Sequence, residues 1–290
     1  MPWQRWRERG IETFIWCCGV VSILFVILIF LFLLKEGLAL FKTVSLGEFL
    51  GGRFWYPISE PPRFGILPLL LGSLWVTVGA IVMSVPIGVG SALFISEVAT
   101  GWTKEILKTG IELLAAIPSV VLGFVGMMVL APAIKSSFEL PSGLTALTGS
   151  ITLALMAMPT IVSITEDALT AVPQRYREAA FGLGATKWQM MHRVLLPAAR
   201  SGILAAVMLG IGRVIGETMA VMMVTGNAAV IPGTLLEPVR TMTATIAAEM
   251  GETVRGSAHY FALFAIGIVL FVISFVINVL ADLFLHRERA

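Results

Sequence analysis

The chain has 290 residues, of which 57% are hydrophobic and only 13% are charged. Soluble globular domains carry about 25% charged residues, so this composition argues against a soluble protein. The formal net charge is +2 and no basic stripe is present, which argues against binding to nucleic acid.

Six apolar segments are long enough to cross a membrane as helices, and together they predict an all-α membrane protein. A helix rises 1.5 Å per residue, so about 20 residues cross a hydrocarbon core of about 30 Å. The predicted spans are residues 12–34, 69–92, 109–134, 147–165, 199–223 and 260–284. We expect the first span to remain as an anchor, because it is too long for a cleaved signal peptide. Cys17 and Cys18 are adjacent within it and imply no disulfide framework.

The distribution of Lys and Arg predicts how these spans are oriented. With the N-terminus inside, the cytoplasmic segments hold more basic residues, closer to the span ends, than the outer segments do. Basic segments tend to stay in the cytoplasm, so both termini are predicted there. The predicted organisation is a tail and anchor (1–35), an outer loop (36–68), a helical core (69–285) that contains a cytoplasmic loop (166–197), and a C-terminal tail (286–290).

Two outer segments are long, and several spans contain proline. Residues 36–66, with Trp55 and Pro57, predict an irregular interfacial loop, and residues 225–258 predict a short helix on the outer side. Proline removes a backbone donor and kinks a helix, so we expect bends at four positions. These positions are Pro86, Pro118, Pro132 and Pro159. Ordinary bends in a packed bundle are the favoured interpretation, and a role in gating is the alternative.

The cytoplasmic loop 166–197 predicts two short helices joined by a glycine elbow. We expect the fourth span to end at the water near Glu166. Gly182 and Gly184 interrupt the first short helix. The sequence from Thr186 to Gln189 matches a capping box, which predicts the start of the second helix.

The second of these helices predicts a docking surface. Trp188 and Met191 lie three residues apart and are predicted to share one face, with Arg177, Lys187 and Arg193 around it. An aromatic centre with a charged rim is typical of a protein interface. The alternative is an ordinary loop held against the bundle.

A family resemblance favours docking. The loop carries a spaced pattern made of Glu178, Ala179, Ala180, Gly184, Val194, Leu196 and Pro197. It resembles the EAA loop of binding-protein-dependent ABC importer permeases, with Val194 in place of the usual isoleucine. In that family the loop is a coupling helix that sits in a groove of the ATPase subunit. The resemblance implies a core like that of type I ABC importer permeases, with ATPase coupling through Glu178, Ala179, Ala180, Gly184 and Trp188. The glycine would allow a turn that a Cβ would obstruct.

The fifth predicted span carries two charges. Arg213 and Glu217 are four residues apart, so on one helix they would share a face and partly neutralise each other. Each charge costs roughly 2.5–3.5 kcal/mol at the centre of a membrane helix, which favours a functional role beside a substrate path. The alternative is a buried ion pair that fixes the packing of this helix.

A narrower resemblance concerns the transported ion. The stretches 212–221, 117–121 and 238–243 resemble phosphate-specific permeases, and the long outer loop resembles their PstC-like subunit. The resemblance implies inorganic phosphate as substrate, in a multi-pass protein of the bacterial inner membrane. It implies three partners: a PstA-like second permease, a PstB-like ATPase dimer and a PstS-like periplasmic binding protein. Arg240 is either a meeting point for the arriving anion or a residue that fixes the outer loop.

The chain lacks a phosphate-binding loop of the Walker type, so we expect no enzyme activity of its own. ATP and Mg²⁺ would be bound by the partner ATPase, with no cofactor in this chain. His192, His259 and His286 are scattered and predict no metal site. Three alternatives remain open: an ion-coupled secondary anion carrier with Glu217 as proton site, an ABC permease for another oxyanion, and a membrane protein that only recruits a partner.

Overall fold

The computed structural model describes the backbone of residues 2–287 and, within that range, all side chains except those of residues 2–10, 281–282 and 284–287. The side chain of His286 and most of the predicted tail 286–290 therefore lie outside the described residues. The long helices are α1 (Pro2–Leu38), α3 (Leu67–Leu93), α4 (Gly101–Ala116), α7 (Ala146–Thr170), α11 (Arg200–Gly216) and α14 (Ala258–Arg287).

Shorter elements connect these helices. The short α-helices are α2 (Leu46–Gly51), α5 (Ser119–Val125), α6 (Ala131–Ser137), α8 (Gln174–Gly182), α9 (Lys187–Met190), α10 (Leu196–Ala198), α12 (Met219–Val224) and α13 (Met242–Glu249). A 3₁₀ turn η1 (Ala39–Lys42) follows α1, and three π-helical turns occur at η2 (Phe94–Val98), η3 (Gly126–Leu130) and η4 (Met191–Leu195). Two short strands, β1 (Trp55–Tyr56) and β2 (Arg63–Phe64), pair antiparallel with Trp55 opposite Phe64.

The predicted all-α membrane fold is confirmed, and the described residues include five helices long and apolar enough to cross a membrane. They are Ile11–Lys42, Leu67–Val98, Ser119–Ser137, Ala146–Thr170 and Ala258–Leu280. A sixth candidate is a pair of segments, Lys187–Ala198 and Arg200–Gly216, which meet at a bend of 72°. The fifth predicted span corresponds to the second segment of this pair, α11.

The predicted start of the third span, 109–134, is wrong. Helix α4 ends at Ala116, Ile117 takes an extended conformation, and the candidate span begins at Ser119. The cause is Pro118, because a residue before proline is pushed out of the helical region and proline itself offers no N–H. The bend that we expected at Pro118 is therefore a complete break between two helices.

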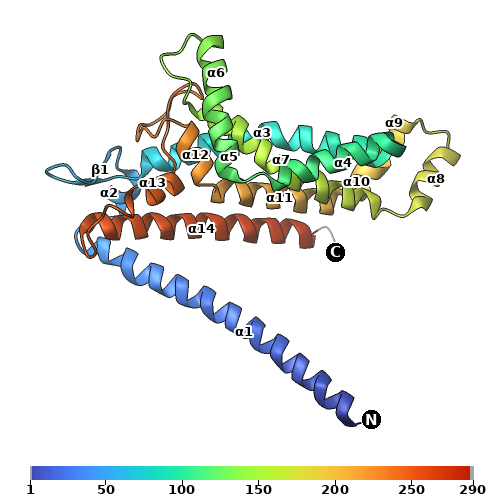
Figure 1. Cartoon of the computed structure of the whole chain (residues 1–290), viewed down its shortest axis with the longest axis horizontal. Coiled ribbons are helices and arrows are strands. Elements are labelled where there is room, and N and C mark those ends of the chain that lie inside the picture. Colours follow the sequence, from blue (N-terminus) through green and yellow to red (C-terminus); the bar gives the residue numbers. More distant parts are fainter. Residues whose placement is uncertain (1, 288–290) are drawn as a thin grey trace.

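The core of the molecule consists of α3, α7 and α11, which lie side by side (Figure 1). Small residues allow the close approach of these helices. A Cβ at Gly88 of α3 would lie 2.8 Å from a side-chain atom of Ile161 in α7, and a Cβ at Gly210 of α11 would lie 2.7 Å from another atom of the same side chain. A Cβ at Gly212 or Gly216, by contrast, would meet no atom within 4 Å, so these two glycines do not lie at a helix contact.

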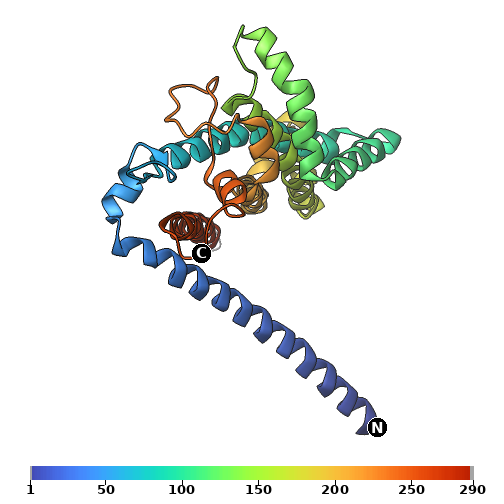
Figure 2. The ribbon, with the colours of Figure 1, turned by 60° about the vertical axis from the view of Figure 1, so that its left-hand side comes forward.

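Helix α1 diverges from this core. It contacts α14 near its C-terminal end, where the Phe30 and Phe271 rings are tilted with centroids 4.5 Å apart and Phe32 packs edge-on against Phe264. From there it runs away from the bundle, as Figures 1 and 2 show. Its apolar side chains between Ile11 and Phe32 are largely exposed in this single chain. In a membrane they would contact lipid or another protein chain.

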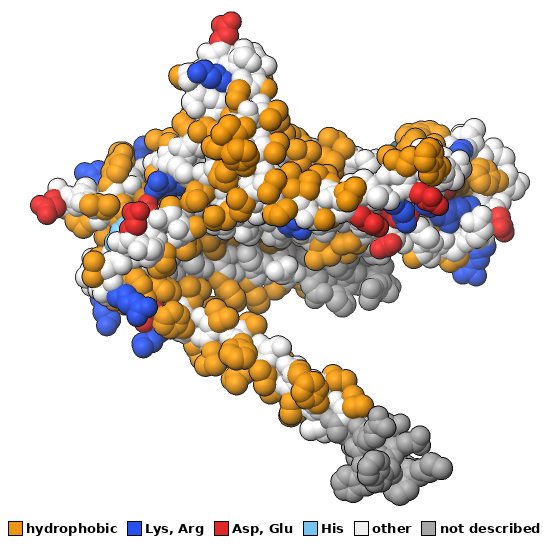
Figure 3. Space-filling model, in the orientation of Figure 1, with side chains coloured by type: hydrophobic (Ala, Val, Ile, Leu, Met, Phe, Trp, Pro, Cys, Tyr) orange, Lys and Arg blue, Asp and Glu red, His pale blue; other side chains and the backbone are white. Residues whose placement is uncertain are grey.

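The two ends of the molecule differ in structure. We call the end with α8 and α9 the elbow end, and the end with β1, β2 and α13 the hairpin end (Figure 1). Helix α1 begins and α14 ends toward the elbow end. On the face shown in Figure 3, charged side chains gather near the ends, and hydrophobic side chains dominate between them. This distribution matches a bilayer-spanning bundle.

The hairpin end is more ordered than predicted. The segment 36–66, expected to be irregular, forms α2 and the β1–β2 hairpin, whose Phe49 and Trp55 are buried against α14. The short helix expected within 225–258 is present as α13, and its position on the outer side stays a prediction. Apolar residues in both segments form one buried cluster with the start of α14, which explains why the loop is ordered.

Candidate functional site: the elbow and the broken fifth helix

The glycine elbow is a helix C-cap of the Schellman type. The Ala185 N–H donates to the Ala180 carbonyl at 3.0 Å, and the Gly184 N–H donates to the Phe181 carbonyl at 2.9 Å. Gly184 has a φ of +79°, a left-handed conformation that side chains with a Cβ disfavour. A Cβ there would meet no atom within 4 Å, so the reason for glycine is backbone conformation and not the steric obstruction that we expected.

The second short helix begins as predicted. The Thr186 hydroxyl accepts the Gln189 N–H at 3.3 Å, and the Gln189 side chain accepts the Thr186 N–H at 2.8 Å. These two bonds satisfy backbone donors that a helix N-terminus leaves free. The capping box therefore fixes the direction in which α9 leaves the elbow.

The tip of the elbow presents apolar side chains to solvent. Leu183 is 90% exposed, Trp188 is 64% exposed and Phe181 is 50% exposed. Of the pattern residues, Glu178, Ala179 and Gly184 are exposed and Ala180 is buried. Exposed apolar groups of this size at a water-facing tip are typical of an interaction surface.

Two expectations about this surface are wrong. Met191 is buried beneath the elbow and does not share a face with Trp188, whose ring instead contacts His192 edge-on at 6.0 Å. Arg177 does not belong to a charged rim either, because its side chain is only 12% exposed.

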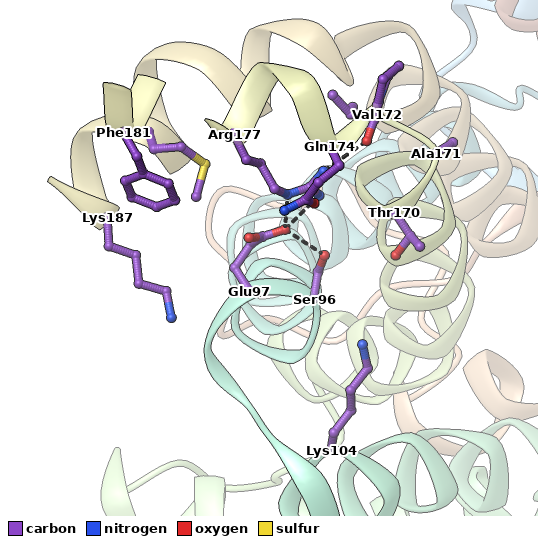
Figure 4. Close-up of a pocket in the computed structure, with 12 residues that line it drawn as sticks. Ser96, Glu97, Lys104, Thr170, Ala171, Val172, Gln174, Arg177, Phe181 and Lys187 are labelled. Atoms are coloured by element: carbon purple, nitrogen blue, oxygen red, sulfur yellow. Dashed lines mark hydrogen bonds and ion pairs between the residues drawn. The ribbon is translucent and has the colours of Figure 1, made fainter. Parts of the chain in front are cut away.

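Arg177 is the polar anchor of the elbow. Its Nε and Nη2 donate to the Glu97 carboxylate at 3.1 and 2.8 Å, and it also donates to the carbonyls of Val172 and Leu169. Glu97 lies in η2, at the end of α3, and the two carbonyls lie at the end of α7. One guanidinium thus joins α8 to the ends of α3 and α7, and Figure 4 shows its bonds to Glu97 and to Val172.

A polar cleft opens beside this anchor. It has a volume of about 630 Å³ and lies between the end of α3, the start of α4 and the elbow. Lys104, Ser96 and Gln174 are among its lining residues (Figure 4). The Glu97–Arg177 pair forms part of its wall, although both side chains are largely buried.

Helix α4 is attached to α7 by a second group of charges. The Glu166 carboxylate pairs with Lys108 at 2.8 Å and with Lys104 at 3.7 Å. The hydrogen bond to Glu166 raises the pKa of Lys108 above its usual value of 10.5, so the ammonium stays charged at neutral pH. The expected helix end at Glu166 is wrong, because α7 continues to Thr170 and the carboxylate is buried.

The fifth predicted span is broken at its charged pair. Helix α11 ends at Gly216, Glu217 is extended with φ −71° and ψ 134°, and α12 starts at Met219. Arg213 and Glu217 therefore do not share one helical face, although their spacing predicted that they would. Arg213 is exposed and makes no ion pair or hydrogen bond with the described residues.

Glu217 instead fixes the break. Its carboxylate accepts the Ala220 N–H at 3.1 Å, and its backbone carbonyl accepts the Thr243 hydroxyl at 2.9 Å. The first bond places a negative charge at the N-terminus of α12, where it is favourable. Arg213 is left as an unpaired cation in the last turn of α11, roughly 20 Å along the helix axis from Arg200.

Arg240 is tied to a carboxylate at the hairpin end. Its guanidinium donates to Glu249 and to the Asn227 carbonyl, the latter at 3.1 Å. Glu249 also bonds to the His259 ring at 2.8 Å and accepts the Trp55 indole N–H at 3.1 Å. This geometry favours the second of our two interpretations, in which Arg240 fixes the outer loop.

Replacing Glu249 by alanine should destabilise the hairpin end. The change leaves Arg240, His259 and Trp55 without their shared acceptor, which should cost about 2 kcal/mol. We expect the thermal unfolding midpoint in detergent to fall by roughly 5 °C. The matched control is Glu252→Gln, since Glu252 is exposed on the same segment. Equal midpoints for both variants would contradict a stabilising cluster.

Some of these residues were predicted from the sequence, and others were not. Glu97 and Glu249 were not predicted to matter, and they are the carboxylates that hold Arg177 and Arg240. The position of Glu97, directly after an apolar span, is a signal that could have been used. No metal-binding cluster of His, Cys, Asp or Glu occurs among the described residues.

The fold and the elbow together define a class: a permease of the kind found in type I ABC importers. A chain in the structure of a bacterial alginate ABC transporter has the same fold, with a TM-score of 0.67 at 17% identity over 98% of this chain and 97% of that chain. The MetNI methionine ABC transporter gives a TM-score of 0.60 at 18% identity over 79% of this chain and 99% of that chain.

The sequence identifies the family. Residues 84–290 match the family described as binding-protein-dependent transport system inner membrane component, and the chain belongs to this family. A relative from Bacillus subtilis, named probable ABC transporter permease protein YqgH, is 40% identical over 98% of this chain and 91% of its own length. The phosphate transport system permease protein PstC of Mesorhizobium japonicum is 38% identical over 84% of this chain and 79% of its own length.

Proposed function

We propose that this chain is the PstC-like permease subunit of an ATP-driven importer of inorganic phosphate. The observation that carries the proposal is the similarity, across most of the chain, to proteins named as phosphate transport permeases. The unpaired Arg213 supports it, because a guanidinium offers several donors in a geometry that fits phosphate oxygens.

The proposed assembly contains four kinds of chain. A PstA-like permease would complete the path and cover apolar surfaces that are exposed here, a PstB-like ATPase dimer would bind ATP and Mg²⁺, and a PstS-like protein would deliver phosphate at the hairpin end. The elbow end would face the cytoplasm, together with both termini. This orientation agrees with the distribution of Lys and Arg.

In this proposal the elbow is the part of the chain that the ATPase moves when it hydrolyses ATP. Glu178, Ala179 and Gly184 are exposed on it, and Trp188 and Leu183 supply apolar contact area. Ala180, although part of the same pattern, would support the docking surface from beneath, because it is buried against the bundle. Closure of the ATPase dimer would move the elbow, and the membrane helices would follow.

Arg213 would meet the anion inside the path. A cation on a membrane helix is expensive unless it has a partner, and Arg213 has none among the residues described. A transported anion would supply the missing partner for part of each cycle. Glu217 sits at the break that follows and would limit how long the anion stays, because like charges repel.

Labelled-phosphate uptake in vesicles that hold the full complex would test this function. We expect uptake that requires both ATP and the binding protein, and competition by unlabelled phosphate but not by sulfate or molybdate at equal concentration. Preferred uptake of sulfate or molybdate would mean an ABC permease for another oxyanion. Uptake by this chain alone, without an ATPase, would mean a secondary carrier.

A further inference from the structure

We infer that the Arg177–Glu97 pair is the joint through which movement of the elbow reaches α3 and α7. The inference rests on the proposed function, since it assumes that an ATPase moves the elbow. Arg177 would act here as a positioning residue, without contact to the transported anion.

The elbow has two kinds of connection to the membrane helices. The first is covalent: α10 leads through a 72° bend at Ala199 into α11. A bend between two helices can absorb movement, because rotation there need not displace the helix that follows. At its other end the elbow is joined to α7 by the short non-helical turn 171–173. The second kind of connection is the contact of the elbow with the ends of α3 and α7, and only this contact reaches α3.

Arg177 makes the second connection stiff. Its guanidinium holds the Glu97 carboxylate with two nitrogens and the Val172 and Leu169 carbonyls with others. The side chains of Arg177 and Glu97 are only 12% and 9% exposed, so water competes little for these bonds. A planar guanidinium can satisfy several fixed acceptors at once, which the single ammonium of lysine cannot do in the same geometry.

Apolar packing supports this polar joint. Ala92 and Ile95 from the end of α3, Leu169 from α7, and Ala180 and Met190 from the elbow belong to one buried cluster. Apolar contacts resist separation of the elements, but they permit sliding because they have no preferred direction. Directed hydrogen bonds from Arg177 fix the register of the elbow on the two helices.

The route continues from α3 and α7 to the helix that carries Arg213. Ile161 of α7 packs against Gly88 of α3 on one side and against Gly210 of α11 on the other. Gly210 lies one helical turn before Arg213. Since these contacts leave no free space, a shift of α3 and α7 must press on α11 next to its unpaired cation.

The test compares two variants of the pair with two matched controls in the reconstituted full complex. The variants are Glu97→Gln and Arg177→Lys. The controls are Glu105→Gln on α4 and Arg175→Lys on α8, and both of these side chains are exposed. Three quantities are measured: the ATPase that co-purifies, the rate of ATP hydrolysis and the rate of labelled-phosphate uptake.

We expect both variants to keep the ATPase but to hydrolyse about tenfold more ATP per phosphate imported, a typical size for the loss of coupling between two sites. The two controls should hydrolyse as much ATP per phosphate imported as the unaltered complex does. The double variant should be no worse than either single variant, because both remove the same interaction.

A covalent cross-link that takes the place of the Arg177–Glu97 pair provides a second test. Ser96 and Gln174 line the cleft beside the pair. In the Glu97→Gln variant, with Cys17 and Cys18 replaced by serine, cysteines at these two positions would be joined by a short thiol cross-linker. We expect the cross-link to lower the ratio of ATP to phosphate toward that of the unaltered complex.

Each contrary outcome is decisive. An unchanged ratio in both variants would overturn the inference, and so would loss of the ATPase from them, because the pair would then shape the docking surface and not transmit movement. Failure of the cross-link to restore coupling would also count against it. Absence of the ATPase from the unaltered complex would overturn the proposed function, and this inference with it.

Discussion

Replacing Arg213 by alanine should abolish phosphate uptake while the complex still assembles. The guanidinium has no ion pair or hydrogen bond with the described residues, so its removal leaves no partner group stranded and should not disturb the fold. A charge-assisted contact between arginine and phosphate in a water-poor path is worth about 3 kcal/mol. Its loss should lower uptake at least about a hundredfold.

Two further variants test whether the loss of uptake is specific to the guanidinium of Arg213. Arg255→Ala removes an exposed arginine at the hairpin end and should leave uptake unchanged. Arg213→Lys keeps the charge but loses the fork of donors, so it should retain a small fraction of uptake. Binding of the ATPase to the complex is measured in parallel. Full uptake by Arg213→Ala would show that this residue does not bind the transported anion.

The break after Arg213 adds a reason to expect this sensitivity. On a continuous helix, Glu217 would lie beside Arg213 and partly cancel its charge. In the structure the Glu217 carboxylate is used to cap α12, and the cation is left uncompensated. An uncompensated cation inside a membrane protein is tolerated only where another charge or water reaches it, which is the property required of an anion path.

How far the sequence predicts the structure depends on the range of the interactions. The apolar runs predict the membrane spans because length and composition are local properties, and Thr186 with Gln189 predicts a helix start for the same reason. The break at Glu217 was missed, because local propensity alone allows a helix to continue through this stretch. Its cause is tertiary: the Thr243 hydroxyl bonds to the Glu217 carbonyl from 26 residues away.

In the candidate site, too, local interactions could be predicted from the sequence and long-range interactions could not. The EAA-like pattern and the elbow could be found from the spacing of residues within one loop. The role of Arg177 could not, because its partner Glu97 lies 80 residues away in the chain. Glu249 and Trp55 are separated by 194 residues, so the cluster around Arg240 was equally hidden. Charged residues at the ends of spans find partners that only the packing of the helices determines.

Replacing Gly184 by valine should release the ATPase from the complex. Gly184 adopts φ +79°, which a β-branched side chain opposes by at least about 1–2 kcal/mol. The elbow can relieve this strain only by changing the turn between α8 and α9, and this turn sets the relative positions of Phe181, Leu183 and Trp188. We expect co-purification of the ATPase, and ATP-driven uptake with it, to fall about tenfold, as a strain of this size implies.

The structure supplies a matched control for this substitution. A Cβ at Gly182 or at Gly184 would meet no atom within 4 Å, but only Gly184 has a positive φ. Gly182→Val should therefore keep most of the bound ATPase, since valine in a helix costs less than 1 kcal/mol relative to alanine. Gly184→Asn should also keep it, because asparagine tolerates the left-handed region. If Gly184→Val and Gly182→Val retained the same amount of ATPase, the shape of the elbow would not determine docking, and the contact with the ATPase would have to lie elsewhere on this chain.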